Sequence, residues 1–248
     1  MPTPFTHLAM AKQLQPHLLE RLPSAHALIM EYLPAFYLGS IAADAKIEGQ
    51  GRDATHFYEY TRPMQDEPWR VMLAAHPDLR QPTTPAWRVF IAGYVAHLAA
   101  DAYWSRYMLA PHFAKATWGE SGAWRFYVLH FLLTAMDERD QAQLDALDPD
   151  ILSACDAQDW LPFMPHRVLL DWRDFIAEQL RGVSQTVPIF ASRIGISAQQ
   201  MRTTLDSPTQ MQSMLWTHIS PQTLAEIEAG MFDHALVQLG LYWQASAE

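Results

Sequence analysis

The longest run of apolar and small residues lies near the middle of the chain, from Val89 to Ser105. Within this run, only His97 and Asp101 have side chains that can carry a charge. The run is too short and too polar at its centre for a membrane span, which needs about 20 apolar residues. It is typical of a helix buried in a protein core, and we expect a long central helix from about Pro85 to Leu109.

Apolar positions at helical spacing, with proline, serine or threonine at the starts of segments, predict helices along the rest of the chain. Before the central helix, we expect a first helix that ends near Glu20. Three further helices should cover 23–32, 35–43 and 68–75. After it, we expect helices at 122–136, 166–181, 185–193, 197–206, 208–216 and 220–244. No convincing alternation of apolar and polar residues predicts a strand, so the fold class is all-α.

Composition places the chain among folded proteins. Its 248 residues are half hydrophobic and include 9 Trp, 11 Phe and 9 Tyr, enough for a large core. The single cysteine, Cys155, excludes an intramolecular disulfide framework and a cysteine-based zinc knuckle. The N-terminal residues lack the basic region and apolar core of a signal peptide, so we expect a cytoplasmic protein without a transmembrane segment.

The formal net charge of −10 bears on the class of partner. Non-specific binding to nucleic acid relies on Lys and Arg against phosphates, so we expect none here. An acidic protein can still act on a phosphate if a bound metal ion supplies the local positive charge. The sequence leaves the oligomeric state open.

The composition of the sequence changes after residue 137. The segment 138–165 is acidic and is interrupted by Pro149, Pro162 and Pro165. No repeat, low-complexity segment or Gly/Ser linker separates the parts on either side. We expect residues 1–137 to form a metal-binding helical core, and residues 138–248 to form a helical scaffold packed on it within one compact domain.

His97 and Asp101 are the chemically informative pair of the central helix. Residues four apart lie on one helical face, so both side chains point into the core. A buried carboxylate needs a metal ion or an opposite charge, and no Lys or Arg follows at helical spacing before Arg106, which faces elsewhere. The pair therefore indicates half of a metal site or, with about equal weight, a hydrogen-bonded His–Asp pair.

Further candidates lie at helix ends or on apolar helix faces before residue 138: His7, Asp44, His56 and His130. Imidazole and carboxylate ligands without a thiolate suit zinc, manganese or iron. Asp44, His56, His97 and Asp101 could complete one site. The second oxygen of Asp101 could bridge to another ion near His7, which would give the two-metal arrangement of many phosphoesterases.

Four motifs in this order resemble the zinc-dependent phospholipase C family, which shares its superfamily with zinc-dependent single-strand nucleases such as P1 nuclease. The motifs are Thr6-His7, Leu38-Gly39-Ser40-Ile41-Ala42-Ala43-Asp44, Asp53-Ala54-Thr55-His56-Phe57-Tyr58 and Gly93-Tyr94-Val95-Ala96-His97-Leu98-Ala99-Ala100-Asp101. Their order and spacing agree with the family over roughly residues 1–137.

The resemblance implies a multi-helical bundle, here with a C-terminal helical extension, that holds one to three zinc ions, two being expected. It implies that Asp44, His56, His97 and Asp101 hold one zinc, and that Asp101 bridges to a second zinc on His7. Asp44 is then the general base, or the group that orients the attacking water.

The third zinc site of the family is incomplete in this sequence. Tyr107 stands where the family has a histidine, and Thr134 stands where it has a carboxylate. His130 remains as a candidate ligand, with Asp137 as a substitute for the missing carboxylate.

Three hypotheses for the function follow. The first is a zinc-dependent phosphodiester hydrolase, similar to phospholipase C, in which a metal-activated water attacks a phosphodiester or phospholipid. The second is a non-enzymatic helical protein with a structural metal or a degenerate site. The third is a single-strand nuclease of the same superfamily, which the acidic charge disfavours.

Overall fold

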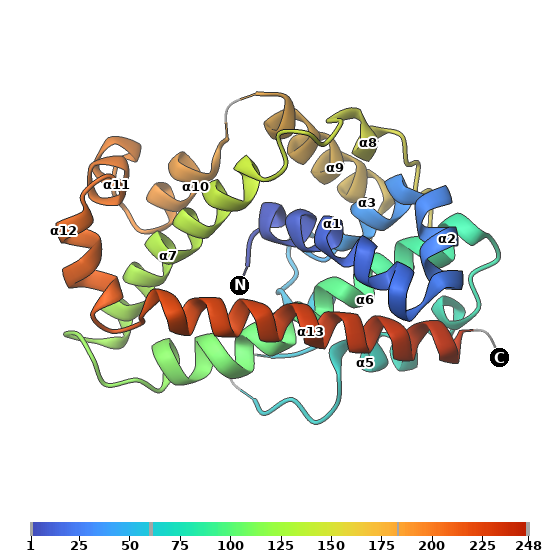
Figure 1. Cartoon of the computed structure of the whole chain (residues 1–248), viewed down its shortest axis with the longest axis horizontal. Coiled ribbons are helices and arrows are strands. Elements are labelled where there is room, and N and C mark those ends of the chain that lie inside the picture. Colours follow the sequence, from blue (N-terminus) through green and yellow to red (C-terminus); the bar gives the residue numbers. More distant parts are fainter. Residues whose placement is uncertain (1, 60–61, 183, 247–248) are drawn as a thin grey trace.

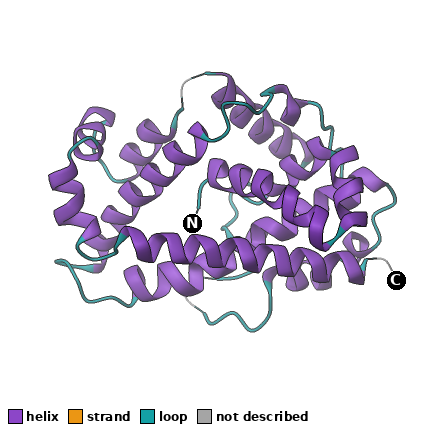
Figure 2. Cartoon of the chain, in the orientation of Figure 1, coloured by secondary structure: helices purple, strands orange, loops and turns teal. Residues whose placement is uncertain are grey.

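The computed structural model describes residues 2–59, 62–182 and 184–246. These residues form helices and connecting loops without any strand (Figure 2). The helices of the first half are α1 (Pro4–Arg21), α2 (Pro23–Glu31), α3 (Leu33–Ala42), α4 (Asp53–His56), α5 (Pro68–Ala75), η1 (Pro77–Arg80), α6 (Pro85–Trp104) and η2 (Ser105–Ala114). The helices of the second half are α7 (Gly122–Ala142), α8 (Asp150–Ser153), α9 (His166–Arg181), α10 (Thr186–Arg193), α11 (Ala198–Leu205), α12 (Pro208–Met211), η3 (Gln212–Trp216) and α13 (Pro221–Ala245). The all-α fold class is confirmed.

Short polar side chains and prolines start the helices where the sequence indicates. The Thr84 hydroxyl accepts a hydrogen bond from the Trp87 N–H, and Pro85 occupies the first helical position of α6. The Ser220 hydroxyl caps α13 in the same way, again followed by proline. At α11, Ser197 and Gln200 form a reciprocal capping box.

The central helix differs from the expected one in its last turns. The α-helical part ends at Trp104, and the chain continues as wider π-helical turns from Ser105 to Ala114. Pro111 lies inside these turns and has no N–H to donate to a carbonyl four residues earlier. The π-helical register continues to the end of η2, where the Lys115 N–H bonds to the Ala110 carbonyl.

Helix α6 forms the centre of the molecule, and every residue from Val89 to Ala102 is buried. Helix α3 crosses it so closely that a Cβ atom added at Gly39 would lie 2.0 Å from the Phe90 carbonyl oxygen. A Cβ atom at Gly93 would likewise lie 2.2 Å from the Phe36 carbonyl oxygen. The two glycines therefore allow the backbones to touch, which brings the end of α3 next to the polar face of α6.

The C-terminal half wraps around this core. Helix α13 is the long red helix that runs along one side of the molecule, against α6 (Figure 1). Helix α1 begins near the middle of the same view, with α7 and α10 to its left and α9 above it (Figure 1). Helix α7 continues through residue 137, where we expect the core to end, and the division of the chain into core and scaffold stays a prediction. Among the described residues, no helix combines the length and apolar character needed to cross a membrane.

Candidate metal centre

Helix α6 supplies the two central groups of the site. His97 and Asp101 are both fully buried, and the His97 Nε2 lies 3.6 Å from the Asp101 Oδ2. The His97 Nδ1 pairs at 2.8 Å with the carbonyl oxygen of Ser40 on α3. Only a protonated nitrogen can donate to a carbonyl, so this contact fixes the tautomer and leaves the Nε2 lone pair facing the site.

His56 reaches the same point from α4, a single helical turn. Its Nδ1 lies 2.9 Å from the Thr55 hydroxyl and 3.3 Å from the Arg52 carbonyl, which again directs Nε2 inward. The Tyr94 hydroxyl of α6 donates to the Thr55 carbonyl at 2.8 Å and holds this turn in place. The ring of Tyr94 is buried in the core, and its hydroxyl anchors the α4 turn.

His7 comes from the first turns of α1, and its ring stacks on that of His97 with 3.7 Å between centroids. Of two buried aspartates of α7, Asp140 binds the start of α1 and Asp137 binds α10. Asp140 accepts a 2.7 Å hydrogen bond from the Thr6 hydroxyl, and Asp137 accepts one from the Thr186 hydroxyl of α10. A carboxylate near a helix N-terminus also interacts favourably with its dipole, so Asp140 stabilises the position of His7.

The donor atoms form a cage of the size that zinc requires. The His56 Nε2 lies 3.3 Å from the His97 Nε2, 3.2 Å from the Asp101 Oδ2 and 3.6 Å from the Asp44 Oδ1. Zinc–ligand bonds of ~2.0–2.2 Å in a tetrahedron give edges of roughly 3.3–3.6 Å. Two imidazole lone pairs this close repel each other unless a cation lies between them.

Several buried polar atoms of the cluster lack hydrogen bonds, and most buried polar groups in proteins have them. Among the described residues, no hydrogen-bond partner reaches His7 Nδ1, His7 Nε2, Asp44 Oδ2 or Asp101 Oδ1. The His7 Nε2 and Asp101 Oδ1 are 3.3 Å apart without the geometry of a hydrogen bond. The atoms fall into two groups that share His97: His7, His97 and Asp101, and Asp44, His56 and His97. Both groups fit the donor chemistry of zinc.

Sequence reasoning missed one residue of the cluster, Arg52. Its guanidinium donates to the Asp101 Oδ2 at 2.5 Å and to the Asp44 Oδ1 at 3.1 Å. The expectation that these carboxylates have no cationic partner without metal is therefore wrong. The arginine comes from the loop before α4, which has no helical spacing to Asp101, so periodicity along α6 gives no sign of it.

The electrostatics of the cluster favour ionised carboxylates. Burial would raise the pKa of Asp101, but Arg52 and the histidines outweigh it and hold that pKa well below its usual value. The same balance lowers the pKa of Asp44. Burial lowers the pKa of His7 to about 4, so its ring is neutral at physiological pH and available as a ligand. Burial also acts to lower the pKa of His97, but the carboxylates of Asp101 and Asp44 raise it overall.

The structure brings together His7, Asp44, His56, His97 and Asp101, but not His130. The His130 Nδ1 pairs with the Phe126 carbonyl of its own helix at 2.7 Å, and the residue belongs to neither group of donors. It lines the pocket beside the cluster instead. Thr134 is buried and donates to the His130 carbonyl, and Tyr107 is half exposed. Ligation of an ion by His130 stays a prediction.

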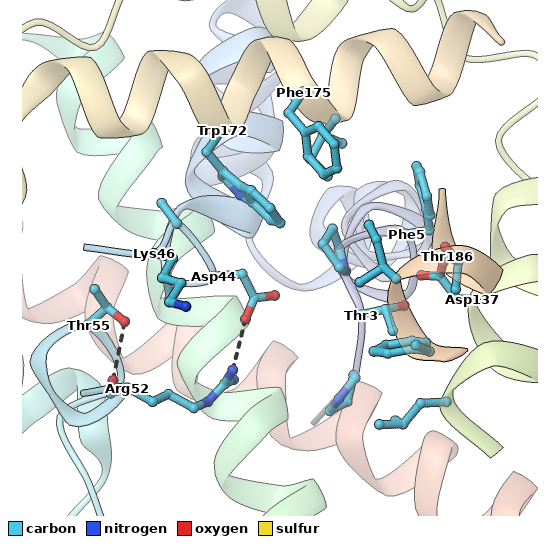
Figure 3. Close-up of a pocket in the computed structure, with 18 of the residues that line it drawn as sticks. Thr3, Phe5, Asp44, Lys46, Arg52, Thr55, Asp137, Trp172, Phe175 and Thr186 are labelled. Atoms are coloured by element: carbon cyan, nitrogen blue, oxygen red, sulfur yellow. Dashed lines mark hydrogen bonds and ion pairs between the residues drawn. The ribbon is translucent and has the colours of Figure 1, made fainter. Parts of the chain in front are cut away.

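A pocket of about 560 Å³ opens beside the cluster, with Asp44, Arg52 and His56 in its lining. Figure 3 shows Asp44 and Arg52 on one side of it, with Thr3, Asp137 and Thr186 across the cavity. Trp172 and Phe175 of α9 lie along its upper wall in this view (Figure 3). The Trp172 Nε1–H donates at 2.8 Å to the Ile41 carbonyl, which fixes the wall to the end of α3 just before Asp44.

Comparison with known proteins bears on the same residues. A family model described as zinc dependent phospholipase C matches residues 6–161, which is more than half of the chain. The matched segment contains the whole cluster and ends before α9 and α10 begin. No curated protein and no solved structure matches the chain.

Proposed function

This chain belongs to the zinc-dependent phospholipase C family, and on that premise we propose that it hydrolyses phosphodiesters at a two-zinc centre. The proposal rests on one observation above all, the two overlapping groups of buried His and Asp donors. Metal ions ~3.5–4 Å apart stabilise both the attacking and the leaving oxygen in phosphodiester hydrolysis.

In this proposal, Asp44, His56, His97 and Asp101 hold one zinc ion. His7 and Asp101, which belong to the other group of donors, would hold the second ion. Zinc at such a centre neutralises the phosphate charge and lowers the pKa of a coordinated water towards ~7.

The protein side chains supply the remaining chemistry. The Asp44 side chain is one of the few groups of the cluster that reaches the pocket, with 10% of its surface exposed. Its lowered pKa keeps it ionised at neutral pH, so it can accept a hydrogen bond from the attacking water and orient it. Its position at the pocket also makes it the candidate general base. The guanidinium of Arg52 also faces the pocket, and its planar set of donors suits two oxygens of a bound phosphate.

Metal analysis and hydrolysis of p-nitrophenyl phosphorylcholine test the proposal together. Protein purified without chelator should contain about two zinc ions per chain. Asp101→Asn removes the bridging charge and should lose metal and activity together. Asp44→Asn should keep more of the metal, because only Asp101 serves both ions, and should lower kcat/KM by about 10²- to 10⁴-fold through loss of the base.

Asp171→Asn is the matched control, because Asp171 is an exposed aspartate of α9 that pairs with the exposed Arg167. It should retain metal and activity. Phospholipid in mixed micelles and single-stranded DNA are the other substrates to compare. Zinc-loaded protein that cleaves only the DNA would favour the nuclease hypothesis, and no cleavage of any substrate would leave a structural metal site.

A further inference from the structure

The pocket is richer in basic groups than the protein around it. The chain carries a net charge of −10 and has only three lysines, yet Lys46, Arg52 and Arg193 all line this one cavity. Asp44 and Asp137 are its only acidic lining residues among those described. Asp44 belongs to the candidate metal cluster and Asp137 is buried against Thr186, and within the described chain neither forms an ion pair with Lys46 or Arg193.

Arg193, like Arg70, lies over an aromatic ring and forms no ion pair with a described residue, whereas most arginines of the chain do. Arg139, Arg181 and Arg202 each form an ion pair with a carboxylate. Arg193 forms no ion pair or hydrogen bond with any described residue, and its guanidinium lies over the Phe190 ring at 4.8 Å from the centroid. That contact steadies the side chain and leaves its N–H donors available.

Lys46 and Arg193 approach the pocket from opposite halves of the chain. Lys46 follows Asp44 by two residues, and Figure 3 shows its side chain next to Asp44 at the pocket edge. Arg193 ends α10, which lies beyond the segment that the family model matches. Partial desolvation lowers the pKa of Arg193 while the Asp44 carboxylate acts to raise it, so the two charges interact across the cavity.

We propose that Arg193, with Lys46, binds a second phosphate on the substrate, so that the preferred substrate is a phosphodiester that also carries a phosphomonoester. The inference rests on the proposed function. The scissile phosphate is held at the metal cluster with Arg52, and Arg193 on α10 is left for a separate anionic group. Arginine suits a phosphate because its fork of N–H donors can bond two oxygens at once.

Calorimetric binding to the zinc-loaded protein tests the subsite without turnover. The probes are myo-inositol 1-phosphate and myo-inositol 1,4-bisphosphate, which differ by one phosphate. Wild-type protein should bind the bisphosphate about 10-fold more tightly, and added salt should reduce this preference because the subsite is open to solvent. Arg193→Gln should reduce the preference towards 1, and Arg193→Lys should restore part of it.

Arg181→Gln is the control, because Arg181 lies outside the pocket and pairs with the exposed Asp150. It should keep the wild-type preference. Equal affinities of the two probes in wild-type protein, or an undiminished preference in Arg193→Gln, would overturn the subsite.

Hydrolysis assays distinguish the proposed hydrolase activity from the proposed phosphate subsite. They also show whether the substrate is a lipid or a soluble phosphodiester. Phosphatidylinositol 4-phosphate in mixed micelles should be cleaved faster than phosphatidylinositol, and glycerophosphoinositol 4-phosphate tests a soluble source. A preference for the bisphosphate in protein that cleaves nothing would keep the subsite and refute the hydrolase. Hydrolysis without any preference for the second phosphate would do the reverse.

Discussion

The two sides of the pocket are built in opposite ways. The proposed metal side consists of His7, His56, His97 and Asp101, all 0–1% exposed. Hydrogen bonds to a carbonyl or a hydroxyl hold His97 and His56, and the guanidinium of Arg52 pairs with Asp101. On the wall formed by α9 and α10, Phe175 is 40% exposed and Arg193 has no polar partner among the described residues. The metal side holds ionisable groups inside the core, and the wall side exposes apolar and basic side chains that a ligand can contact.

This difference separates the chemistry of the protein from its selectivity. A buried cluster tolerates little change, because each donor atom is fixed by a second contact and each charge depends on the others. Apart from Trp172, which is bonded to the end of α3, the wall has few such constraints, so we expect side chains such as Phe175 and Arg193 to vary without loss of the metal centre. The wall helices also lie outside the matched family segment, which is where selectivity for a particular substrate would be encoded.

Removal of metal should have the largest effect on the stability of the protein. If it had none, the contrast between a metal side and an open wall would no longer hold. At free zinc about 1,000-fold above its Kd, binding adds about 4 kcal/mol to the free energy of unfolding. Chelator should therefore lower the melting temperature of the wild-type protein, and added zinc should restore it. An unchanged melting curve after confirmed metal loss would mean that the cluster is only a His–Asp–Arg network.

Asp137 tests whether a buried ionisable group across the pocket also affects the stability of the protein. Burial raises its pKa from 3.8 to about 7 despite the hydrogen bond from Thr186. The folded protein then keeps a proton that the unfolded chain loses, so stability should fall by up to about 4 kcal/mol as the pH rises from about 4 to 7.

Asp137→Asn keeps an oxygen that can accept the Thr186 hydrogen bond and removes the ionisation. Urea unfolding at pH 5 and pH 8 should show a smaller loss of stability in this variant than in wild type. The same pH slope in both proteins would assign the effect to another group.

Arg52 offers a sharper test of the metal side. In metal-free protein its guanidinium compensates Asp101 and Asp44, so Arg52→Ala should lower the free energy of unfolding by about 1.5–3 kcal/mol. In zinc-loaded protein the ions supply that charge, and the loss should be smaller. A larger loss with zinc than without it would contradict the role of Arg52 as a counter-ion.

The sequence predicts the fold well because the signals are local. Thr84-Pro85 and Ser220-Pro221 mark helix starts through caps and fixed proline geometry, and the structure has α6 and α13 beginning there. The end of α6 was predicted less well. A shift from α-helical to π-helical turns after Trp104 changes the hydrogen-bond register without changing the apolar pattern that indicates a helix.

For the site, the sequence predicts a role for His97 and Asp101 because a pair of ionisable residues in an apolar run has few explanations. Arg52 and Arg193 were not, because each acts across a long sequence separation and each sits in an ordinary polar context. Trp172 and Phe175 were equally hidden. Helix α9 is strongly amphipathic, and its pattern does not distinguish apolar residues that face the core from those that face a cavity.

Phe175 gives the smallest effect on stability and the most direct test of the wall. Its side chain is 40% exposed and lines the pocket, so Phe175→Ala should change the free energy of unfolding by no more than about 0.5 kcal/mol. Zinc content should be unchanged, since no donor atom contacts it. If the wall contacts the substrate, the variant should raise KM for phospholipid in mixed micelles several-fold while kcat for p-nitrophenyl phosphorylcholine stays near wild type. A large loss of stability or of zinc in Phe175→Ala would show instead that the wall supports the metal centre, and the contrast between a constrained cluster and an open wall would no longer hold.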